Sequence, residues 1–414
     1  MKTAIMTVGN ELVTGRIRDK NAAVIAKGIH AQGWQVIAVV SVGDNKQDMA
    51  WALNGLLSRA DAVIVTGGLG PTADDVTTAA VAEILGLPLY RDEAVLRRIM
   101  DLFAARGLKW TENNAKQAYF PAGARIIPNP VGTADGFALR HGEGLIVVIP
   151  GVPSEAARMF AEGVLPLLRE TFPGRAKAVA SRTFKLFGLP EAAVDEALSG
   201  LDPAGRGVEI GFYPEFPENH LVVTARADDA AEASRRLEET CREVETRLRR
   251  YIFAYDEDTL EGVVSSLLME RGLTLAVAES CTGGLITDRL TDVPGSSAFL
   301  IQGIVAYSNR AKMALLGVPE EVLLAHGAVS DQTAVLMARG VRAAAGTDLG
   351  LSVTGIAGPT GGSEEKPVGT VYMALADNER SLCRRYRFRW NRRRNKIISS
   401  QAALILLKDY LMGE

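Results

Sequence analysis

The alternation of continuous apolar segments with amphipathic ones constrains the fold of this chain more than any other feature. Apolar, β-branched runs that end in glycine occur at residues 3–9, 34–43, 60–68 and 144–151. Helical patterns occur at 20–32, 46–59 and 154–170. Strands that are apolar along their whole length are buried on both faces, and strands that alternate with helices pair in parallel. Residues 1–171 are therefore predicted to form an α/β domain with a mainly parallel sheet.

The same alternation returns in the last third of the chain. Strands are predicted at 273–278, 299–307, 348–354, 369–377 and 384–390. Helices are predicted at 259–271, 283–292, 309–316, 330–345 and 392–411. This order predicts a second α/β domain, again with a mainly parallel sheet, over residues 253–414.

Residues 172–252, between the two domains, have a different pattern. Strand-like runs lie at 178–188, 207–214 and 219–228, and helical patterns lie at 190–199 and 229–249. This β-α-β-β-α order is typical of a small α+β module and resembles a KH-type arrangement. The segment has no GxxG loop of the kind that clamps an RNA backbone. We therefore expect a KH-like connector with a structural role rather than an RNA-binding one.

Charge and cysteine content narrow the classes of partner and compartment. The 414 residues carry a net charge of −3, which offers no general attraction for nucleic acid or an anionic membrane. Three cysteines, Cys241, Cys281 and Cys383, are too few for a disulfide framework and fit a reducing cytosol. The chain contains no apolar run of about 18 residues and does not begin with a signal peptide pattern. We expect a cytoplasmic protein with neither membrane nor nucleic acid as a partner.

A glycine-rich loop, TGGLGPTADDVT at 66–77, follows the third predicted strand. Glycines let backbone amides approach a phosphate, and the N-terminus of the next helix adds positive charge. Asp74 and Asp75 provide hard oxygen ligands for a divalent cation beside that phosphate. Further carboxylates at neighbouring strand ends or loops are Glu11, Asp19 and Asp44. The alternative interpretation is a tight turn with an aspartate N-cap.

The segments VGNELVTGRIRDKN, GGLGPTADDVT and PGVPSE resemble the molybdopterin-binding domain family, most of all the branch found in CinA proteins. The resemblance covers about residues 1–170 and implies a phosphate-bearing ligand. For the CinA branch it implies a metal-dependent ADP-ribose pyrophosphatase, with a divalent metal ion at Asp74 and Asp75. The expected nucleotide site comprises Gly9, Asn10, Glu11, Asp44, Gly67, Gly68, Gly70, Thr72, Asn114 and Lys116.

Two potential nucleophiles, Ser280 and Cys281, stand side by side where a predicted strand passes into a helix. The backbone amides of residues 281–284 at the start of that helix can hold an oxyanion. A serine needs a base, whereas a cysteine needs a cationic partner and a depressed pKa. We favour Ser280 as the nucleophile and expect Cys281 to pack as a small apolar residue that contributes its amide.

Lysine is a better base for Ser280 than histidine. His326 is the one histidine of the C-terminal domain, and its place in LLAHGAVS indicates a helix end. Lys312 in YSNRAKMALLG follows a strand end that also carries Tyr307 and Asn309. It can act as a base if burial or nearby cations keep it neutral, whereas most lysines are solvated surface groups.

Two later segments are suited to binding an anion. The glycine-rich loop at 352–371 exposes backbone between two predicted strands, although a flexible connection is the alternative. Arg392, Arg393 and Arg394 follow Asn391, a predicted N-cap, at the start of a helix. Cations there are electrostatically unfavourable unless an anion is bound, although solvated surface arginines are common.

The segments AESCTGG, GIVAYSNRAK, GAVS, TGIAGPTGG and KPVGTVY resemble the C-terminal domain of CinA, which is similar to the nicotinamide mononucleotide amidohydrolases. The resemblance implies hydrolysis of the nicotinamide mononucleotide carboxamide, without a cofactor, to nicotinic acid mononucleotide and ammonia. It implies a Ser-Lys mechanism at Ser280 and Lys312. The expected pocket residues are Glu279, Cys281, Thr282, Gly283, Gly284, Tyr307, Asn309, Thr354, Gly355, Arg392 and Arg394.

Both resemblances together identify the chain as similar to a full-length CinA protein. The main hypothesis is an amidase that acts on nicotinamide mononucleotide, with ADP-ribose pyrophosphatase as a second activity. A competence- or DNA-damage-linked nucleotide-binding adaptor without catalysis is the alternative. Two nucleotide-binding domains around a small connector also lead us to expect a homodimer.

Overall fold

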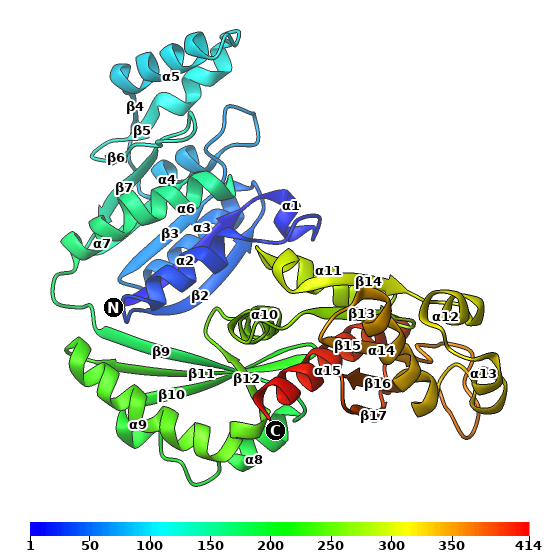
Figure 1. Cartoon of the computed structure of the whole chain (residues 1–414). Helices are drawn as coiled ribbons and strands as arrows, with labels where there is room; N and C mark the ends of the chain where they lie inside the picture. The colour runs from blue at the N-terminus through cyan, green and yellow to red at the C-terminus, as the bar shows by residue number, and fades with distance from the viewer. Residues whose placement is uncertain (414) are drawn as a thin grey trace. The chain divides into compact units, whose positions relative to one another are not determined.

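The computed structural model describes residues 1–413 (Figure 1). It divides into two compact units. Unit 1 comprises Met1–Ala180 with Arg226–Ser234, and unit 2 comprises Ser181–Ala225 with the residues from Arg235 onward. Across residues 1–413, no helix combines the length and the apolar character that crossing a membrane requires.

Unit 1 contains a six-stranded sheet in the order β2-β1-β3-β8-β7-β6. The strands are β1 (Lys2–Val8), β2 (Gln35–Val42), β3 (Ala62–Thr66), β6 (Arg125–Ile127), β7 (Gly136–His141) and β8 (Gly144–Ile149). The first four strands of that order pair in parallel, as predicted, and β7 and β6 form an antiparallel edge. Two short strands, β4 (Leu89–Arg91) and β5 (Tyr119–Pro121), form a separate ladder.

Helices cover both faces of this sheet (Figure 1). They are α1 (Asn10–Val13), α2 (Asn21–His30), α3 (Lys46–Leu57), α4 (Thr77–Ile84), α5 (Glu93–Ala105), η1 (Glu112–Ala118), α6 (Pro153–Met159), the π-helical η2 (Phe160–Val164) and α7 (Leu165–Thr171). Neighbouring residues of β1 point to opposite faces: Ile5 packs in a cluster with Ile25 of α2, and Met6 in a cluster with Leu53 of α3. Burial on both faces explains why the strand is apolar throughout.

The connector has the predicted β-α-β-β-α order. Its elements are β9 (Ala178–Leu186), α8 (Glu191–Ala197), η3 (Ala204–Arg206), β10 (Val208–Glu215), β11 (Glu218–Ala227), α9 (Ala230–Leu248) and η4 (Arg249–Tyr251). The sheet order is β10-β11-β9-β12, and β12 (Ile252–Tyr255) crosses the boundary placed between residues 252 and 253. β10 and β11 form a hairpin whose turn is Phe216 and Pro217. Along α9, Leu237, Val244 and Leu248 are buried at helical spacing.

The C-terminal domain, which lies within unit 2, contains a five-stranded sheet in the order β14-β13-β15-β16-β17. The strands are β13 (Leu275–Glu279), β14 (Leu300–Val305), β15 (Leu349–Gly355), β16 (Thr370–Ala376) and β17 (Ser381–Arg387). β14, β13 and β15 are parallel, whereas β16 and β17 are antiparallel additions. The link between β16 and β17 is only residues 377–380, which is too short for a crossover and therefore produces a hairpin. The sheet is mixed for this reason.

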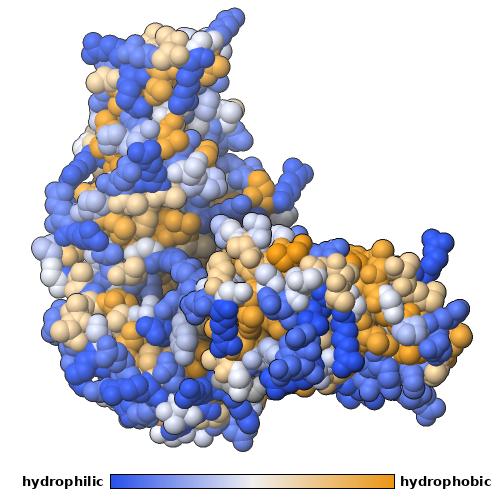
Figure 2. All heavy atoms as spheres, viewed as in Figure 1, coloured by the Kyte–Doolittle hydropathy of each residue, from blue (hydrophilic) through white to orange (hydrophobic). Residues whose placement is uncertain are grey.

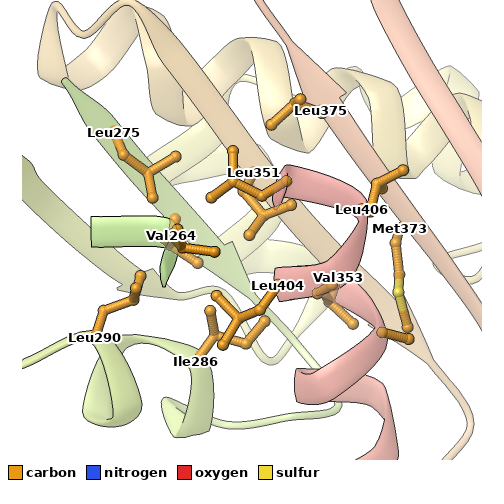
Figure 3. Packing of buried hydrophobic residues seen from close by; sticks show 14 of the residues in the cluster. Val264, Leu275, Ile286, Leu290, Leu351, Val353, Met373, Leu375, Leu404 and Leu406 are labelled. Atoms are coloured by element: carbon orange, nitrogen blue, oxygen red, sulfur yellow. The ribbon is translucent and has the colours of Figure 1, made fainter. Parts of the chain in front are cut away.

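Two layers of helices enclose this second sheet. They are α10 (Leu260–Glu270), α11 (Leu285–Thr291), η5 (Ser296–Ala298), α12 (Asn309–Leu316), α13 (Glu320–His326), α14 (Asp331–Ala345) and α15 (Arg392–Met412). Figure 3 shows Leu275, Leu351 and Val353 of the sheet packed with side chains of α10, α11 and α15. Ala276 and Ala278 point to the other face, where they pack with Met337 of α14. β13 is thus held on both faces immediately before Ser280.

Candidate functional site

The loop after β13 is a sharp turn that presents Ser280. Ser280 extends the sheet ladder by one bond, since its amide donates to the Val353 carbonyl at 2.9 Å. The chain then reverses, with Gly283 donating to the Ser280 carbonyl at 3.2 Å. Gly283 and Gly284 have φ angles of 63° and 96°, a left-handed region that glycine occupies without strain. The turn holds the Ser280 side chain at the carboxyl end of the sheet.

Glu279 fixes the helix that follows this turn. Its carboxylate accepts hydrogen bonds from the amides of Gly284 at 3.0 Å, Ile286 at 3.1 Å and Thr287 at 2.8 Å, and from the Thr287 hydroxyl at 2.8 Å. These bonds satisfy donors that a helix N-terminus leaves without intrahelical partners. Glu279 is fully buried, at 0% exposure. Its oxygens are thus engaged by the start of α11, and its expected place in the substrate pocket stays a prediction.

Lys312 lies directly against Ser280. Its Nζ is 2.9 Å from Ser280 Oγ, 2.8 Å from the Ala306 carbonyl oxygen and 3.4 Å from the Tyr307 carbonyl oxygen. The Ser308 side chain accepts from the Ala311 amide and so caps the helix that carries Lys312. The Ala306 amide in turn donates to the Glu279 carbonyl at 2.8 Å, which joins the ends of β13 and β14. These local contacts together hold Lys312 Nζ beside the Ser280 hydroxyl.

Burial supplies the condition that a lysine base requires. Lys312 is 1% exposed, and desolvation lowers its pKa below the ordinary lysine value of 10.5. The three oxygens around Nζ belong to a hydroxyl and two carbonyls, which are all neutral. A neutral amine can donate its two N–H groups to the two carbonyls and point its lone pair at the serine hydroxyl. This geometry is that of a serine nucleophile with a lysine base.

Cys281 has the opposite environment. It is buried, and burial raises the pKa of its thiol to about 12. A thiol with so high a pKa is protonated near neutral pH and is a poor nucleophile. Cys281 instead packs in the cluster with Ile286 and Leu290, as expected.

The predicted oxyanion donors divide into two pairs. Gly283 and Gly284 already donate to the Ser280 carbonyl and the Glu279 carboxylate, and a role for them in holding an oxyanion stays a prediction. Cys281 and Thr282 are the remaining donors of the predicted set. Thr282 is fully buried.

The expected anion-binding residues separate into those near the turn and those facing elsewhere. Arg392 donates to the Tyr307 hydroxyl at 2.7 Å and to the Gly358 carbonyl at 2.7 Å, which ties the start of α15 to the strand end that precedes Lys312. Arg394 lies instead over the rings of Phe216 and Trp390, 4.8 Å and 5.1 Å from their centroids. Arg394 thus stacks on two rings, and its expected contact with substrate stays a prediction.

The glycine-rich loop and the start of α12 supply the other expected pocket residues. Thr354 is buried and its hydroxyl donates to the Ala328 carbonyl at 2.7 Å. Gly355 lies so close to Thr370 that an added Cβ would be 2.8 Å from its carbonyl oxygen. Asn309 is the exposed first residue of α12. Thr354 therefore has a structural bond, and the expected contacts of all three residues with substrate stay predictions.

One cationic side chain near the Ser280 turn was not predicted as a site residue from the sequence. Lys396 lies one turn beyond Arg392 on α15, and a Cβ added to Gly283 would be 3.5 Å from its Nζ. Residues four apart share a helix face, so Arg392 and Lys396 point in similar directions. The spacing can be read from RRRNK, but the sequence does not show which of these cations face the Ser280 turn. Only the contacts of the start of α15 in the folded domain show it.

A second candidate site lies in unit 1, where the glycine loop passes the end of β1. Gly67 and Gly68 have φ angles of 110° and 68°. A Cβ on Gly67 would lie 2.2 Å from the Val8 carbonyl oxygen, and one on Gly68 would lie 2.1 Å from Thr77 Oγ1. Only glycine fits this approach. Close packing of the loop therefore requires both glycines, in addition to the access that they give to a ligand.

Polar groups gather around this loop. The Thr72 hydroxyl lies 2.5 Å from an oxygen of each carboxylate, Asp74 and Asp75, and the Thr72 amide donates to Asp75 at 2.9 Å. Lys116 donates to the Thr72 carbonyl at 2.6 Å. Asn10 and Asp44 exchange amide-to-side-chain bonds of 2.9 and 3.2 Å. A cavity of about 470 Å³ is lined by residues that include Gly9, Glu11, Asp44, Gly67, Gly68, Gly70, Asp74, Asp75 and Glu155.

Asn114 is not part of this cavity. Its side chain donates to the Thr111 hydroxyl at 2.7 Å and carbonyl at 3.1 Å, and it is 6% exposed. It closes the start of η1, and its expected contact with a nucleotide stays a prediction. Its neighbour Asn113 reaches the Pro71 carbonyl at 3.4 Å and lines an adjoining cavity of about 740 Å³. Glu155 was missed as a site residue because it lies on α6, far along the chain from the loop.

The acidic groups fit a divalent cation. Burial raises the pKa of Asp44, and the negative charges of Glu11, Asp74 and Asp75 raise it further, against the lowering effect of its bond from the Asn10 amide. A cation would relieve this repulsion. Within residues 1–413, no three His, Cys, Asp or Glu side chains are already arranged as a metal cluster. Such a set suits an ion held by one or two carboxylates, with water and phosphate oxygens as the other ligands.

Comparison with known proteins gives the whole chain a family. The chain has a serine–lysine site in a mixed α/β domain, which a KH-like connector joins to a second α/β domain. This combination defines the class of protein to which the chain belongs. Family models match in the same order: "Probable molybdopterin binding domain" at 4–170, "Damage-inducible protein CinA KH domain" at 181–254 and "CinA C-terminal domain" at 257–411.

Full-length relatives agree with these matches. A "CinA-like protein" of Syntrophus aciditrophicus is 60% identical over 412 residues, covering 99% of this chain and 98% of the relative. A "Putative competence-damage inducible protein" of Desulforudis audaxviator is 43% identical and covers 99% of both chains. A solved competence/damage inducible protein from Agrobacterium tumefaciens is 40% identical over 36% of this chain and 93% of its own, with a TM-score of 0.35. The chain belongs to the CinA family.

Proposed function

We propose that the chain hydrolyses the carboxamide of nicotinamide mononucleotide to nicotinic acid mononucleotide and ammonia, with Ser280 as nucleophile and Lys312 as base. The observation that carries the proposal is the 2.9 Å contact between Lys312 Nζ and Ser280 Oγ in a buried setting that lowers the pKa of the lysine. A resident cofactor is not part of this mechanism.

The chemistry follows from the contacts of Lys312. Its lone pair takes the Ser280 proton as Oγ bonds to the carboxamide carbon, and the amides of Cys281 and Thr282 stabilise the oxyanion. The carbon–nitrogen bond then breaks, and the lysine ammonium gives its proton to the departing amine, which leaves as ammonia. Water attacks the resulting Ser280 ester, Lys312 takes the proton of that water, and the proton returns to Ser280 as the acid is released.

Ammonia release from nicotinamide mononucleotide tests this proposal. We expect Ser280→Ala and Lys312→Met each to reduce kcat by about a thousandfold or more, because either change removes half of the reacting pair. Cys281→Ala keeps the backbone amide and changes only a buried thiol, so it separates the two possible nucleophiles. Full activity in Ser280→Ala, or a loss in Cys281→Ala as large as that expected for Ser280→Ala, would contradict the mechanism.

As a second function we propose metal-dependent hydrolysis of ADP-ribose to AMP and ribose 5-phosphate in unit 1. What favours it is the cavity that joins the glycine loop to the mutually repelling carboxylates of Asp44, Asp74 and Asp75. A divalent ion held there would neutralise phosphate charge and position the pyrophosphate. The chain's own contribution is the amides of the glycine loop, which approach the phosphates, and the carboxylates, which hold the ion.

AMP formation from ADP-ribose in the presence of Mg²⁺ tests the second proposal. We expect Asp75→Asn to lower the rate by about a hundredfold, since it removes one negative ligand at the cavity. Asp101→Asn is the matched control, because Asp101 lies on α5 and lines a different cavity. Equal rates in Asp75→Asn and Asp101→Asn would exclude the proposed metal site.

The proposed ligands are small nucleotides, and the adaptor without catalysis is the alternative that failure of both assays would favour. We also keep the homodimer as a proposal. Figure 2 shows hydrophobic residues gathered on the surface over α12 and α13, where Leu315 and Leu324 are 51% and 81% exposed. A monomer by sedimentation at micromolar concentration would refute it.

A further inference from the structure

The tip of the β10–β11 hairpin of the connector packs against the start of α15, and both lie within unit 2. Phe216 at the hairpin turn meets Trp390 edge to face, with ring centroids 5.2 Å apart and planes at 72°. The Arg394 guanidinium lies over both rings, 4.8 Å from the centroid of Phe216 and 5.1 Å from that of Trp390. Edge-to-face pairs and cation–π contacts are both stabilising, and here they share one set of side chains.

A second contact follows two residues beyond the hairpin tip. Glu218 of β11 accepts from Gln401 Nε2 at 3.0 Å, and Gln401 Oε1 accepts from Arg289 of α11 at 2.7 Å. Gln401 is fully buried, so both ends of its amide depend on these partners. Arg289 also pairs with Glu261 and donates to Ser400 at 2.9 Å. The hairpin is thereby bonded to the two helices, α11 and α15, that flank the Ser280 turn.

The face of α15 that meets the connector lies beside the face that meets the Ser280 turn. Arg394 points to the hairpin, whereas Arg392 bonds Tyr307 and the Gly358 carbonyl, and Lys396 approaches Gly283. Four cations within five residues at a helix N-terminus repel one another and the helix dipole. Stacking of Arg394 on the hairpin rings moves one of them out of this cluster and ties the helix start to a second structure.

We propose that the connector hairpin is a positioning element of the Ser280 site: Phe216, acting through Trp390 and Arg394, fixes the first turn of α15 and with it Arg392 and Lys396. This inference rests on the proposed amidase for its kinetic consequence but not for its structural one. Phe216 does not touch the reacting atoms. Its expected effect is on the affinity for an anionic substrate group, not on the chemistry between Ser280 and Lys312.

The test compares Phe216→Ala with Tyr213→Ala in the full chain. Tyr213 is an aromatic residue of the same hairpin that is 60% exposed and serves as the matched control. We expect Phe216→Ala to raise KM for nicotinamide mononucleotide by about three- to tenfold with kcat within twofold, and Phe216→Tyr to restore KM. Tyr213→Ala should leave both constants unchanged.

Amide hydrogen exchange over residues 392–396 supplies a readout that needs no activity. We expect exchange there to be about tenfold faster in Phe216→Ala than in Tyr213→Ala, while exchange in β13 stays the same. If the wild type does not release ammonia but exchange responds in this way, the amidase proposal fails and the positioning role stands. Unchanged exchange at 392–396, or a fall in kcat without a rise in KM, would overturn the positioning role.

Discussion

At the scale of single residues, Lys312 illustrates what a motif can and cannot reveal. The motif YSNRAK indicates that Lys312 lies near Ser280, and this lysine can act as a base if burial or nearby cations keep it neutral. Its burial depends on Ala306 and Tyr307, whose carbonyls meet Nζ only after β14 has paired with β13. Thr354 and Asn114, both expected in binding sites, donate hydrogen bonds to backbone carbonyls that no motif reveals.

The lowered pKa of Lys312 predicts a distinct pH dependence. The rate constant kcat/KM should rise tenfold per pH unit and level off at a pH below 10.5, as the ammonium loses its proton. Lys312→Arg should be inactive at every pH because arginine stays charged. Lys408→Met, a change at another buried lysine of the domain, should keep the rising limb. A flat profile from pH 6 to 10 would argue against lysine as the base.

The same pKa difference predicts how stability changes with pH. Between the folded pKa of Lys312 and its unfolded value near 10.5, the unfolded chain binds a proton that the folded chain does not. The free energy of unfolding should therefore rise with pH in that window and be independent of this group below it. Denaturant unfolding of the wild type and Lys312→Met at several pH values measures the difference, and an identical pH dependence in both would contradict it.

At the scale of elements, the sequence indicated most of the long strands and helices, but it missed α5, β7 and the shortest strands. β4, β5 and β6 have three residues each, too few for a hydrophobic period to be recognised. The antiparallel pairing of β16 and β17 was also not predicted, although the short link between the two strands indicates a hairpin. The role of Glu279 was missed because a strand residue that caps the helix after it leaves no local pattern.

Glu279→Gln tests that role. The substituted amide would turn an NH₂ group toward backbone N–H donors that now meet carboxylate oxygens, so we expect a loss of about 2–3 kcal/mol in the free energy of unfolding of the C-terminal domain. Glu320→Gln is the matched control, since Glu320 is an exposed carboxylate in the first turn of α13. Its cost should stay within about 0.5 kcal/mol. Equal losses in the two variants, measured by denaturant unfolding, would exclude the capping role.

At the scale of the whole molecule, the order of three modules could be predicted from the sequence, because the pattern of the connector differs from the strand–helix alternation on either side of it. The hairpin contact with α15 could not be predicted, since Phe216 and Trp390 are far apart in the chain and neither belongs to a motif. The two candidate sites, by contrast, draw their residues from separate units. Every contact described for Ser280 and Lys312 lies in unit 2, and every residue lining the glycine-loop cavity lies in unit 1.

This separation predicts that the two proposed activities can be removed one at a time. Chelation of divalent ions should abolish AMP formation from ADP-ribose, and Asp75→Asn should lower it by about a hundredfold, while ammonia release from nicotinamide mononucleotide stays within twofold in both cases. Ser280→Ala should do the reverse. Both products can be measured in one reaction that contains both substrates, with thermal unfolding as the check that each variant is folded. A tenfold loss of ammonia release in folded Asp75→Asn would contradict this separation and would mean that the carboxylates of unit 1 act on the serine site. A global structural defect would appear in the unfolding curve. A defect confined to the glycine loop would not change the surroundings of Lys312.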